Sequence, residues 1–525
     1  MLNYLQNCHN MELWKELEIL RKNKSWLLGR ENIKEKIDAL NNIDKLGLPS
    51  AISHLVPFLK NENIEIRNLT LFVILNLFEK ISSKKNFYET LKYTDIKNDD
   101  FTFYKNNFKE KYLVVLLAIA SLNNNGFIRE KAVKEMIQLQ NPFAIPFIIY
   151  RLSDWVKNIR EVAFKGIEEF KKSKFLQNLI ENIETFEWLQ SVQRVNLNSV
   201  YAETINFIIQ QNKNFVIENF KIFNDNTRII LAKELSKSNE LNEETIQLLS
   251  SDHHFIVRNI ILENFEILSQ EQIKLLLKDK SSKIRFETLY KQKDEPNFKN
   301  IISDYIADKS ATIRDFARFS LKSENLDFAE IYKNNLENNQ NIVGSICGLA
   351  ELNSKEYIYL IEKYLNSNSL KFQKFSFLAL TKLDETKAYE FAIDNLDTQN
   401  IGLRNFIINF IAKKNNSTVL EKARKIYEKG DFHSKISMLK LFAKIGRFAT
   451  IGDLMIGTMN ENEIIRNLSV QLVEQWKRKA NSYFISPKAE ELERANKIFE
   501  IAYEFHEDKK LYFRNPVNEI DFYLK

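Results

Sequence analysis

The chain has 525 residues, a formal net charge of +6 and a hydrophobic content of 44%. The hydrophobic content excludes a disordered chain, and the small charge permits an acidic partner without the concentrated basic face typical of nucleic-acid binding. With only 11 glycines and 7 prolines, the sequence predicts a mostly helical protein with short connections.

The cysteines and the apolar segments of the sequence indicate the cellular compartment in which the protein is expected. Cys8 and Cys347 fit neither a metal-ligand spacing nor a disulfide framework, which indicates a reducing compartment. The first 22 residues lack the apolar core of a signal peptide, and the longest apolar run, residues 112–122, is too short to span a bilayer. We therefore predict a cytoplasmic protein with no membrane span and no cofactor, and an anchor upstream of Met1 is left open.

Three segments are distinguished before residue 112. Residues 1–30 are predicted to form an N-terminal cap, with a polar helix followed by a linker that contains Trp26, Leu27 and Leu28. Residues 46–78 give the first pair of apolar helices. Residues 81–107 then break the pattern, and two interpretations stay open: a degenerate repeat, which we favour, or an insertion that contacts a partner.

A six-residue spacing from an Asp or Asn to an arginine recurs along the chain. The pairs Asp279/Arg285 and Asp308/Arg314 place the two arginines 29 residues apart, and a period between 20 and 50 residues indicates a solenoid. Further copies are Asn61/Arg67, Asn123/Arg129, Asp154/Arg160, Asp252/Arg258 and Asn460/Arg466, and degenerate copies carry Arg194, Arg228, Gly344, Lys374, Arg404 and Lys435.

Each of these anchor positions is predicted to open a helix. The second, third, sixth and seventh residues after the anchor are mostly apolar or small, which is the stripe of an amphipathic helix. Another apolar helix precedes each Asp or Asn, whose short side chain can cap free backbone N–H groups in the turn between the two helices. Residues 481–525 depart from the pattern and are predicted to form a C-terminal capping helix and a tail that contains Tyr512, Phe513, Phe522 and Tyr523.

Residues 46–78 and 141–170 resemble HEAT repeats, and the resemblance extends over residues 31–480. It implies an all-α fold, a right-handed superhelical solenoid of about fourteen HEAT-like helix pairs between the two caps. It also implies a ladder of side-chain bonds that links successive repeats. The residues that correspond to this ladder are Asp154, Arg160, Asp252, Arg258, Asp279, Arg285, Asp308 and Arg314.

The sequence contains no recognisable catalytic or metal-binding motif. His253 and His254 are the only adjacent histidines, and no third ligand stands at a metal-binding spacing. Cys8 and His9 are adjacent, but no third group is placed to orient them. Some HEAT-like solenoids are alkylpurine DNA glycosylases that use Trp and Asp, and here Asp154 precedes Trp155 but already has a ladder position. We predict a protein that is not an enzyme, without catalytic, cofactor or metal residues.

The function predicted is a non-catalytic scaffold or adaptor that binds a protein partner on the concave surface formed by the second helices. The alternative is a nucleic-acid-binding HEAT-like protein, with or without the base-excision chemistry of the alkylpurine DNA glycosylases. Candidate partner-binding residues follow the anchors and lie off the apolar stripe: Phe164, Phe286, Tyr290, Arg318, Phe319 and Phe375. These rings are either buried between repeats, which is slightly favoured, or line a groove for the partner.

Overall fold

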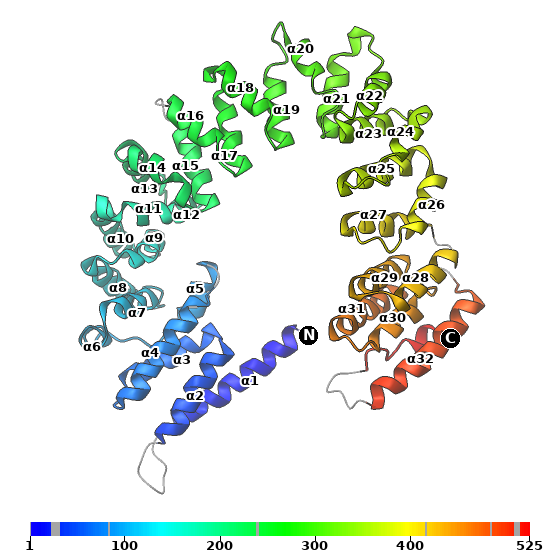
Figure 1. Ribbon diagram of the computed structural model, residues 1–525. Coiled ribbons are helices and arrows are strands. Elements are labelled where there is room, and N and C mark those ends of the chain that lie inside the picture. Colours follow the sequence, from blue (N-terminus) through cyan, green and yellow to red (C-terminus); the bar gives the residue numbers. More distant parts are fainter. Residues whose placement is uncertain are drawn as a thin grey trace. The chain divides into compact units, whose positions relative to one another are not determined.

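The computed structural model describes residues 2–22, 32–81, 84–237, 241–414, 417–483, 486–508 and 515–524, and within those ranges it contains helices and turns but no strand (Figure 1). The predicted all-α fold is confirmed for these residues. Trp26, Leu27, Leu28, Tyr512 and Phe513 lie outside them. The chain divides into two compact units, Met1–Gln272 and Ile273–Lys525, and each unit has its own packed core.

The first unit begins with a 20-residue helix and continues as short helices, several of them flanked by single turns of 3-10 helix. Its helices are α1 (Leu2–Arg21), α2 (Ile33–Leu46), α3 (Ile52–Leu55), α4 (Ile64–Glu79), α5 (Lys84–Leu91), α6 (Asp100–Asn107), α7 (Glu110–Ala120), α8 (Gly126–Leu139), α9 (Ile145–Arg151), α10 (Lys157–Phe170), α11 (Leu176–Glu181), α12 (Ile183–Leu189), α13 (Asn198–Ile205), α14 (Lys213–Asn219), α15 (Asp225–Lys237), α16 (Glu243–Ser250) and α17 (Phe255–Ile260), and α18 (Gln270–Leu277) runs into the second unit.

The second unit continues with a regular alternation of helices. They are α19 (Ser282–Lys291), α20 (Phe298–Ser303), α21 (Ala311–Ser320), α22 (Phe328–Glu337), α23 (Ile342–Glu351), α24 (Ile358–Glu362), α25 (Leu370–Leu383), α26 (Glu385–Asp394), α27 (Ile401–Ile411), α28 (Ser417–Lys429), α29 (Phe432–Ile445), α30 (Ile451–Thr458), α31 (Glu463–Ala480) and α32 (Ala489–Asp508).

The helices are organised as pairs, in which a first helix (A) is followed by a turn and a second helix (B). In the second unit each B helix packs on the next, from α19 through α21, α23, α25, α27 and α29 to α31. Each A helix from α20 to α30 also packs on its own B helix. The first unit shows the same stacking between α2 and α4, between α8 and α10, and between α15 and α17. Contacts are therefore made mostly between neighbouring pairs, as expected of a solenoid.

The six-residue spacing has a local structural cause. At Asp308, the carboxylate accepts a hydrogen bond from the backbone N–H of Ser310 at 2.7 Å, which forms an Asx-turn before helix α21. The guanidinium of Arg314, one turn into the helix, donates back to the carbonyl oxygen of Asp308 at 2.7 Å. The same two bonds occur at Asp154, from Val156 and from Arg160. Arg160 and Arg314 thus fasten their own B helices to the turns that precede them, and the same bond is made by Arg129, Arg258, Arg285 and Arg466.

Several of these arginines also donate to the Asx-turn of the following repeat. Arg129 makes two bonds of 2.9 Å to the carboxylate of Asp154, and Arg285 binds Asp308 at 2.9 and 2.6 Å. Arg228 reaches Asp252 in the same way, at 2.9 Å. We call these arginine–aspartate pairs between successive repeats the cross-repeat bonds. Two parallel N–H···O bonds to one carboxylate fix both the spacing and the orientation of neighbouring repeats.

Two degenerate anchors differ from their assignment by sequence. Lys374 is not the anchor of its repeat, because Gln373 donates to the carbonyl oxygen of Ser367 at 2.9 Å across the same six-residue spacing. The hydroxyl of Ser367 accepts from the N–H of Ser369 and takes the place of the Asx side chain. Arg194 does not open a helix, since it lies in the turn between α12 and α13.

Gly344 stands where the pattern calls for an arginine, for a steric reason. A Cβ atom at this position would lie only 1.9 Å from the carbonyl oxygen of Ala307, so the backbone of α23 approaches the preceding turn too closely for any side chain. Arg314 of the previous repeat binds Glu351 at the end of α23 instead of an aspartate.

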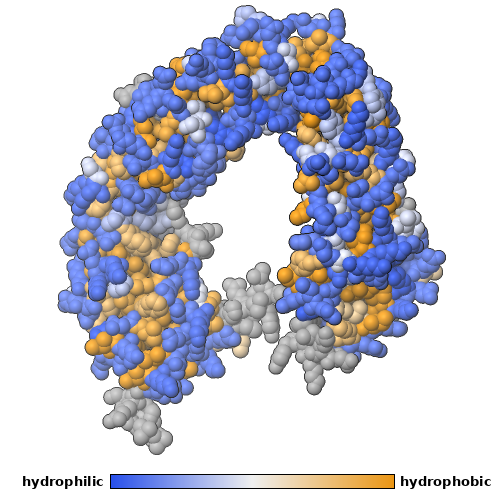
Figure 2. All heavy atoms as spheres, viewed as in Figure 1, coloured by the Kyte–Doolittle hydropathy of each residue, from blue (hydrophilic) through white to orange (hydrophobic). Residues whose placement is uncertain are grey.

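The ends of the chain pack as additional layers. Helix α1 packs on α2, which in turn packs on the largely apolar helix α4. Figure 2 shows that the broadest hydrophobic area on the visible face of the first unit lies over the blue helices around α4. At the other end α32 packs on α30, and the buried carboxylate of Asp453 binds Arg424 at 2.9 Å and Arg494 at 2.5 Å.

Residues 84–107, the larger part of the irregular segment 81–107, contain the two helices α5 and α6. Helix α5 packs on α3, and α6 packs on α7. The intervening turn is tied to the next repeat by Asn123, whose amide donates to the carbonyl oxygen of Thr94 at 2.5 Å. A degenerate repeat remains our prediction for this segment, with an insertion that contacts a partner as the alternative.

We predict that replacing Arg285 with alanine lowers the free energy of unfolding of the second unit by about 1–3 kcal/mol, because Asp308 is left without its charged partner. Native-state hydrogen exchange of α19 and α21 measures the loss. The matched control is Arg466→Ala. Arg466 makes the same kind of bonds to its own turn, to Asn460 and Glu461, as Arg285 makes to Asp279 and Lys280. Equal effects of the two substitutions would show that the cross-repeat bond contributes nothing.

Candidate functional site

Asp154, which the sequence places both in the ladder and next to Trp155, lies at the centre of a buried charged cluster. Its carboxylate is bound by Arg129 from the preceding repeat, by Arg151 at 3.0 Å and by the backbone N–H of Val156 at 2.9 Å. Burial alone would raise the pKa of Asp154, but the hydrogen bonds from Arg129 and Val156 and the charge of Arg151 outweigh it and lower the pKa below its ordinary value.

The surroundings of Arg151 complete this cluster. Burial lowers its pKa to about 10, although the charge of Asp154 opposes that shift. Both carboxylate oxygens of Asp154 accept hydrogen bonds from buried or backbone groups, whereas Trp155 is 73% exposed. Asp154 therefore holds repeats together, and the Asp154–Trp155 pair does not form a joint site.

The other ladder residues also lie at the turns. Arg258 donates to the carbonyl oxygens of Asp252 and His253 at 2.7 and 2.9 Å, and the Asp279 carboxylate accepts from the N–H of Ser281 at 2.6 Å. His253 contacts Arg228 and Asp225, both at 3.1 Å, and is otherwise solvated. Within the described ranges, no three His, Cys, Asp or Glu side chains are grouped so that they could hold a metal ion.

The six candidate partner-binding residues have different surroundings. On α19, Phe286 is half-buried, because Phe316 of the neighbouring helix α21 packs against it with ring centroids 5.4 Å apart. Tyr290 also contacts Phe316, at 6.1 Å, but remains 46% exposed. Phe316, which the sequence analysis did not select, is thus the centre of an aromatic contact between the two repeats.

On α21, Phe319 is 78% exposed and makes no ring contact among the described residues. Its neighbour Arg318 is held in place by Asp315, by Tyr332 at 2.8 Å and by Glu351 at 2.9 Å. In the first unit Phe164 on α10 is exposed, whereas Phe375 on α25 is half-buried beside the ammonium group of Lys374. The structure therefore places Phe286 and Tyr290 on α19, Arg318 and Phe319 on the neighbouring helix α21, and Phe164 and Phe375 on other helices.

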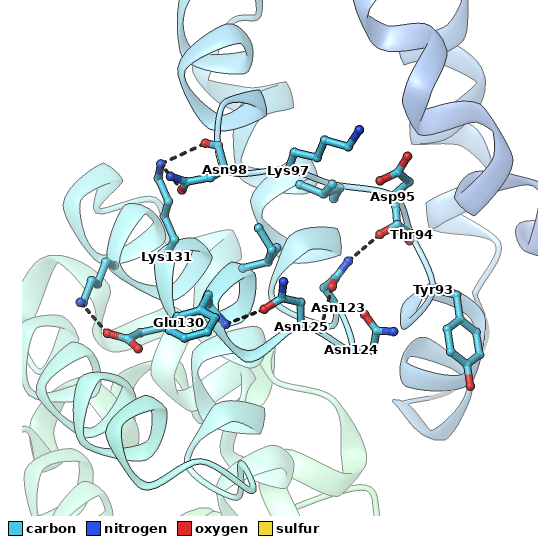
Figure 3. Close-up of a pocket in the computed structure, with 14 residues that line it drawn as sticks. Tyr93, Thr94, Asp95, Lys97, Asn98, Asn123, Asn124, Asn125, Glu130 and Lys131 are labelled. Atoms are coloured by element: carbon cyan, nitrogen blue, oxygen red, sulfur yellow. Dashed lines mark hydrogen bonds and ion pairs between the residues drawn. The ribbon is translucent and has the colours of Figure 1, made fainter.

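A wide groove of about 930 Å³ lies in the first unit, between the turn at residues 92–99 and the turn at residues 121–126 (Figure 3). Lys131 binds Asn98 on one side of the groove, and Asn123 binds Thr94 on the other, so the two turns are fixed to each other. The rings of Phe127 and Tyr93 flank it and are 85% and 71% exposed.

The polar groups in this groove are partly unused. Among the described residues, the side chains of Asn124, Asp95 and Lys97 have no hydrogen-bond partner, and all three are exposed. Amide, carboxylate and ammonium groups of this kind can bind a peptide backbone and its side chains. Sequence reasoning missed this groove, because it arises from two turns that only the stacking of the repeats brings together.

One further structural finding concerns membranes. Within the described part of the chain, none of the helices combines the length and the hydrophobicity that a bilayer-spanning helix needs.

Comparison with known proteins gives only distant structural matches. No family model matches the sequence, and no curated protein matches it. The structure is similar to Kap121p bound to RanGTP, with 12% identity and a TM-score of 0.32, and to a mutant of Kap121p, with 10% identity and a TM-score of 0.31. Both matches cover 95% of this chain and 64% of the other, so the chain spans less than two thirds of Kap121p.

An engineered protein is a third match, with 11% identity, a TM-score of 0.17 and coverage of 89% of this chain and 99% of that one. TM-scores this low carry no argument about function. The architecture follows from the chain's own contacts: helix pairs stacked on their neighbours, Asx-turns between the helices and cross-repeat bonds from arginine to aspartate. Within each unit the chain is therefore a HEAT-like α-solenoid of stacked helix pairs, while the number of pairs and the handedness of the superhelix stay predictions.

The lowered pKa of Asp154 gives a pH dependence that can be tested. Because the folded-state pKa lies below the ordinary value of 3.8, the ionised carboxylate stabilises the fold at every pH above that value, and the contribution is lost as the pH falls through the folded-state pKa. We expect Asp154→Asn to cost roughly 3–5 kcal/mol at pH 7, since two buried guanidinium groups lose their counter-ion. Urea unfolding at pH 7, 5, 4 and 3 should show this difference shrinking only below about pH 4.

The matched control for this experiment is Asp315→Asn. Asp315 also binds an arginine, Arg318, but its carboxylate is exposed, so the substitution should cost less than about 1 kcal/mol at every pH. A cost for Asp154→Asn that is equally small would refute the assignment of Asp154 to a buried cluster.

Proposed function

We propose that the chain is a non-catalytic scaffold that binds a protein partner. The observation that carries this proposal is the exposure of Phe319 beside an immobilised arginine, Arg318, on a helix that is itself fixed to its neighbour. Aromatic and arginine side chains dominate the binding energy of protein interfaces. A ring held on a rigid helix loses little conformational freedom when a partner covers it.

The neighbouring helix α19 extends this surface. Tyr290 stands half-exposed on it, and the bonds from Arg285 to Asp308 join the Asx-turn before α21 to α19. In the proposal the repeats form a right-handed superhelix of about fourteen helix pairs, and the partner lies along the B helices on its concave side. Phe164 and Phe375 would contact other parts of the same partner, and Phe286 would support the contact from below.

The location we propose is the cytoplasm, in keeping with the free thiol of Cys347. A nucleic-acid-binding function finds no comparable support, because the carboxylate of Asp154, the acidic residue that precedes Trp155, is occupied by Arg129 and Arg151.

The test is Phe319→Ser in the full chain. Since the ring makes no ring contact, the fold should be unchanged within about 0.5 kcal/mol. The purified chain is then cross-linked to proteins in an extract of its source cells, and the cross-linked peptides are identified by mass spectrometry. We expect a partner cross-linked to α19 and α21 whose capture falls at least about tenfold with Phe319→Ser, as for loss of a residue worth 1.4 kcal/mol or more in binding.

The matched control is Phe72→Ser, which removes an exposed phenylalanine from the B helix α4. The single change at Phe319 is preferable to a double change with Phe286, because Phe286 packs on Phe316 and its loss would also disturb the fold. The proposal would be contradicted if all partners cross-link outside α19 and α21 and are captured equally well by the Phe319→Ser chain. Retention of the chain on duplex DNA at low salt would instead favour the nucleic-acid alternative.

A further inference from the structure

A pocket in the first unit combines apolar walls with a positively charged rim. Leu152, Phe164, Val195 and Leu197 form its walls, and its volume is about 300 Å³, which accommodates a single large side chain. Arg160, next to the pocket, lies one helical turn before Phe164 on α10, so the cation and the apolar wall face the same space.

The second wall of the pocket is held in place by an unusual contact. Arg194, in the turn between α12 and α13, lies with its guanidinium carbon 3.2 Å from the centroid of the Trp155 ring. It also donates to the carbonyl oxygen of Ser153 at 3.1 Å. The stacking of arginine on an indole ring and this hydrogen bond fasten the turn that carries Val195 and Leu197 against the start of α10. The pocket is therefore a built feature of the fold.

Arg160 differs from the anchor arginines that make cross-repeat bonds. Arg129, Arg228 and Arg285 each bind an aspartate of the following repeat. The following repeat of Arg160 contains no such aspartate, since Trp188 stands six residues before Arg194. Arg160 donates only through Nη1, to the carbonyl oxygens of Asp154 and Trp155, and its Nε and Nη2 have no protein partner among the described residues.

The charges around the pocket are not balanced. Two cations, Arg160 and Lys165, line the pocket, and the one carboxylate in the lining, Glu161, lies 3.7 Å from Lys157. An arginine with two free donors in a fixed fork matches a carboxylate better than any other protein group. The geometry therefore calls for an anionic group next to an apolar one.

We infer that this pocket binds an extended segment of a protein partner, which inserts an apolar side chain between Phe164, Val195 and Leu197 and places a neighbouring Asp or Glu carboxylate on Arg160. That carboxylate supplies the bond which the next repeat provides elsewhere in the solenoid. The inference rests on the proposed scaffold function, because the occupant is a protein, but it concerns a surface separate from Phe319.

A random peptide library displayed on phage, selected against the full chain, tests this inference. We expect the enriched peptides to pair a large apolar residue with an Asp or Glu no more than two positions away. A fluorescein-labelled copy of one enriched peptide should bind Arg160→Gln at least tenfold more weakly than the unchanged chain, and Val195→Glu, which puts a carboxylate into the pocket, should abolish binding.

Arg466→Gln is the matched control, because Arg466 makes the same two bonds to its own turn as Arg160 and lies outside the pocket. It should leave peptide binding unchanged, so that a loss seen with Arg160→Gln cannot come from a weakened turn. Replacing the acid of the peptide by its amide should weaken binding to the unchanged chain and have no further effect on Arg160→Gln.

Three outcomes would overturn the inference: no enrichment of apolar–acidic pairs, equal binding of such a peptide to the Arg160→Gln and unchanged chains, or an Arg160-dependent affinity for a single-stranded oligonucleotide that exceeds the affinity for the peptide. Phe319→Ser is measured in parallel. Suppose that Phe319→Ser abolishes partner capture while Arg160→Gln leaves peptide binding unchanged. This result would reject the pocket as a binding site but would leave the proposed scaffold function intact. The proposed function itself fails only when partner capture ignores Phe319→Ser.

Discussion

The structure depends on one type of side chain, the arginine that stands one turn into a B helix and bonds in two directions. Backward, its guanidinium closes the Asx-turn of its own repeat, as Arg314 does on the carbonyl oxygen of Asp308. In the forward direction, toward the C-terminus, the guanidinium donates to an acceptor on the following repeat, as Arg285 does to Asp308. A guanidinium as buried as that of Arg314 would be costly without such an acceptor. Each repeat is therefore complete only when the next one is in place, which is the physical basis of nearest-neighbour stability in a solenoid.

The backward bond could be predicted from the sequence and the forward bond only in part. A spacing of six residues is local, so Asp308 and Arg314 identify the turn without further information. The forward acceptor depends on how far the next repeat is displaced. It is an aspartate for Arg285, the distant carboxylate of Glu351 for Arg314 and the hydroxyl of Ser437 for Arg404. A period read from the sequence cannot distinguish these cases, and it also cannot decide between adjacent residues such as Gln373 and Lys374.

The aromatic residues show the same limit. Helical periodicity places Phe286 and Phe319 off the apolar stripe of their helices. Whether either ring is covered is decided by the neighbouring helix, because Phe316 reaches Phe286 whereas no ring reaches Phe319 among the described residues. The groove between the turns at 92–99 and 121–126 is likewise a product of stacking. The fold and the turns can thus be predicted from the sequence. Which side chains are exposed cannot, because their exposure depends on contacts between repeats.

The candidate binding features share a position relative to the repeat pattern. Phe319 precedes α23, where Gly344 replaces the anchor arginine, and Arg160 precedes the turn where Arg194 opens no helix. The groove of Figure 3 also lies beside the segment that has no anchor, residues 92–99. A repeat that departs from the pattern leaves its neighbour with a donor or a ring that the fold does not use. In a structure made of nearly equivalent repeats, such departures distinguish a few places from their surroundings, and a partner can recognise those places.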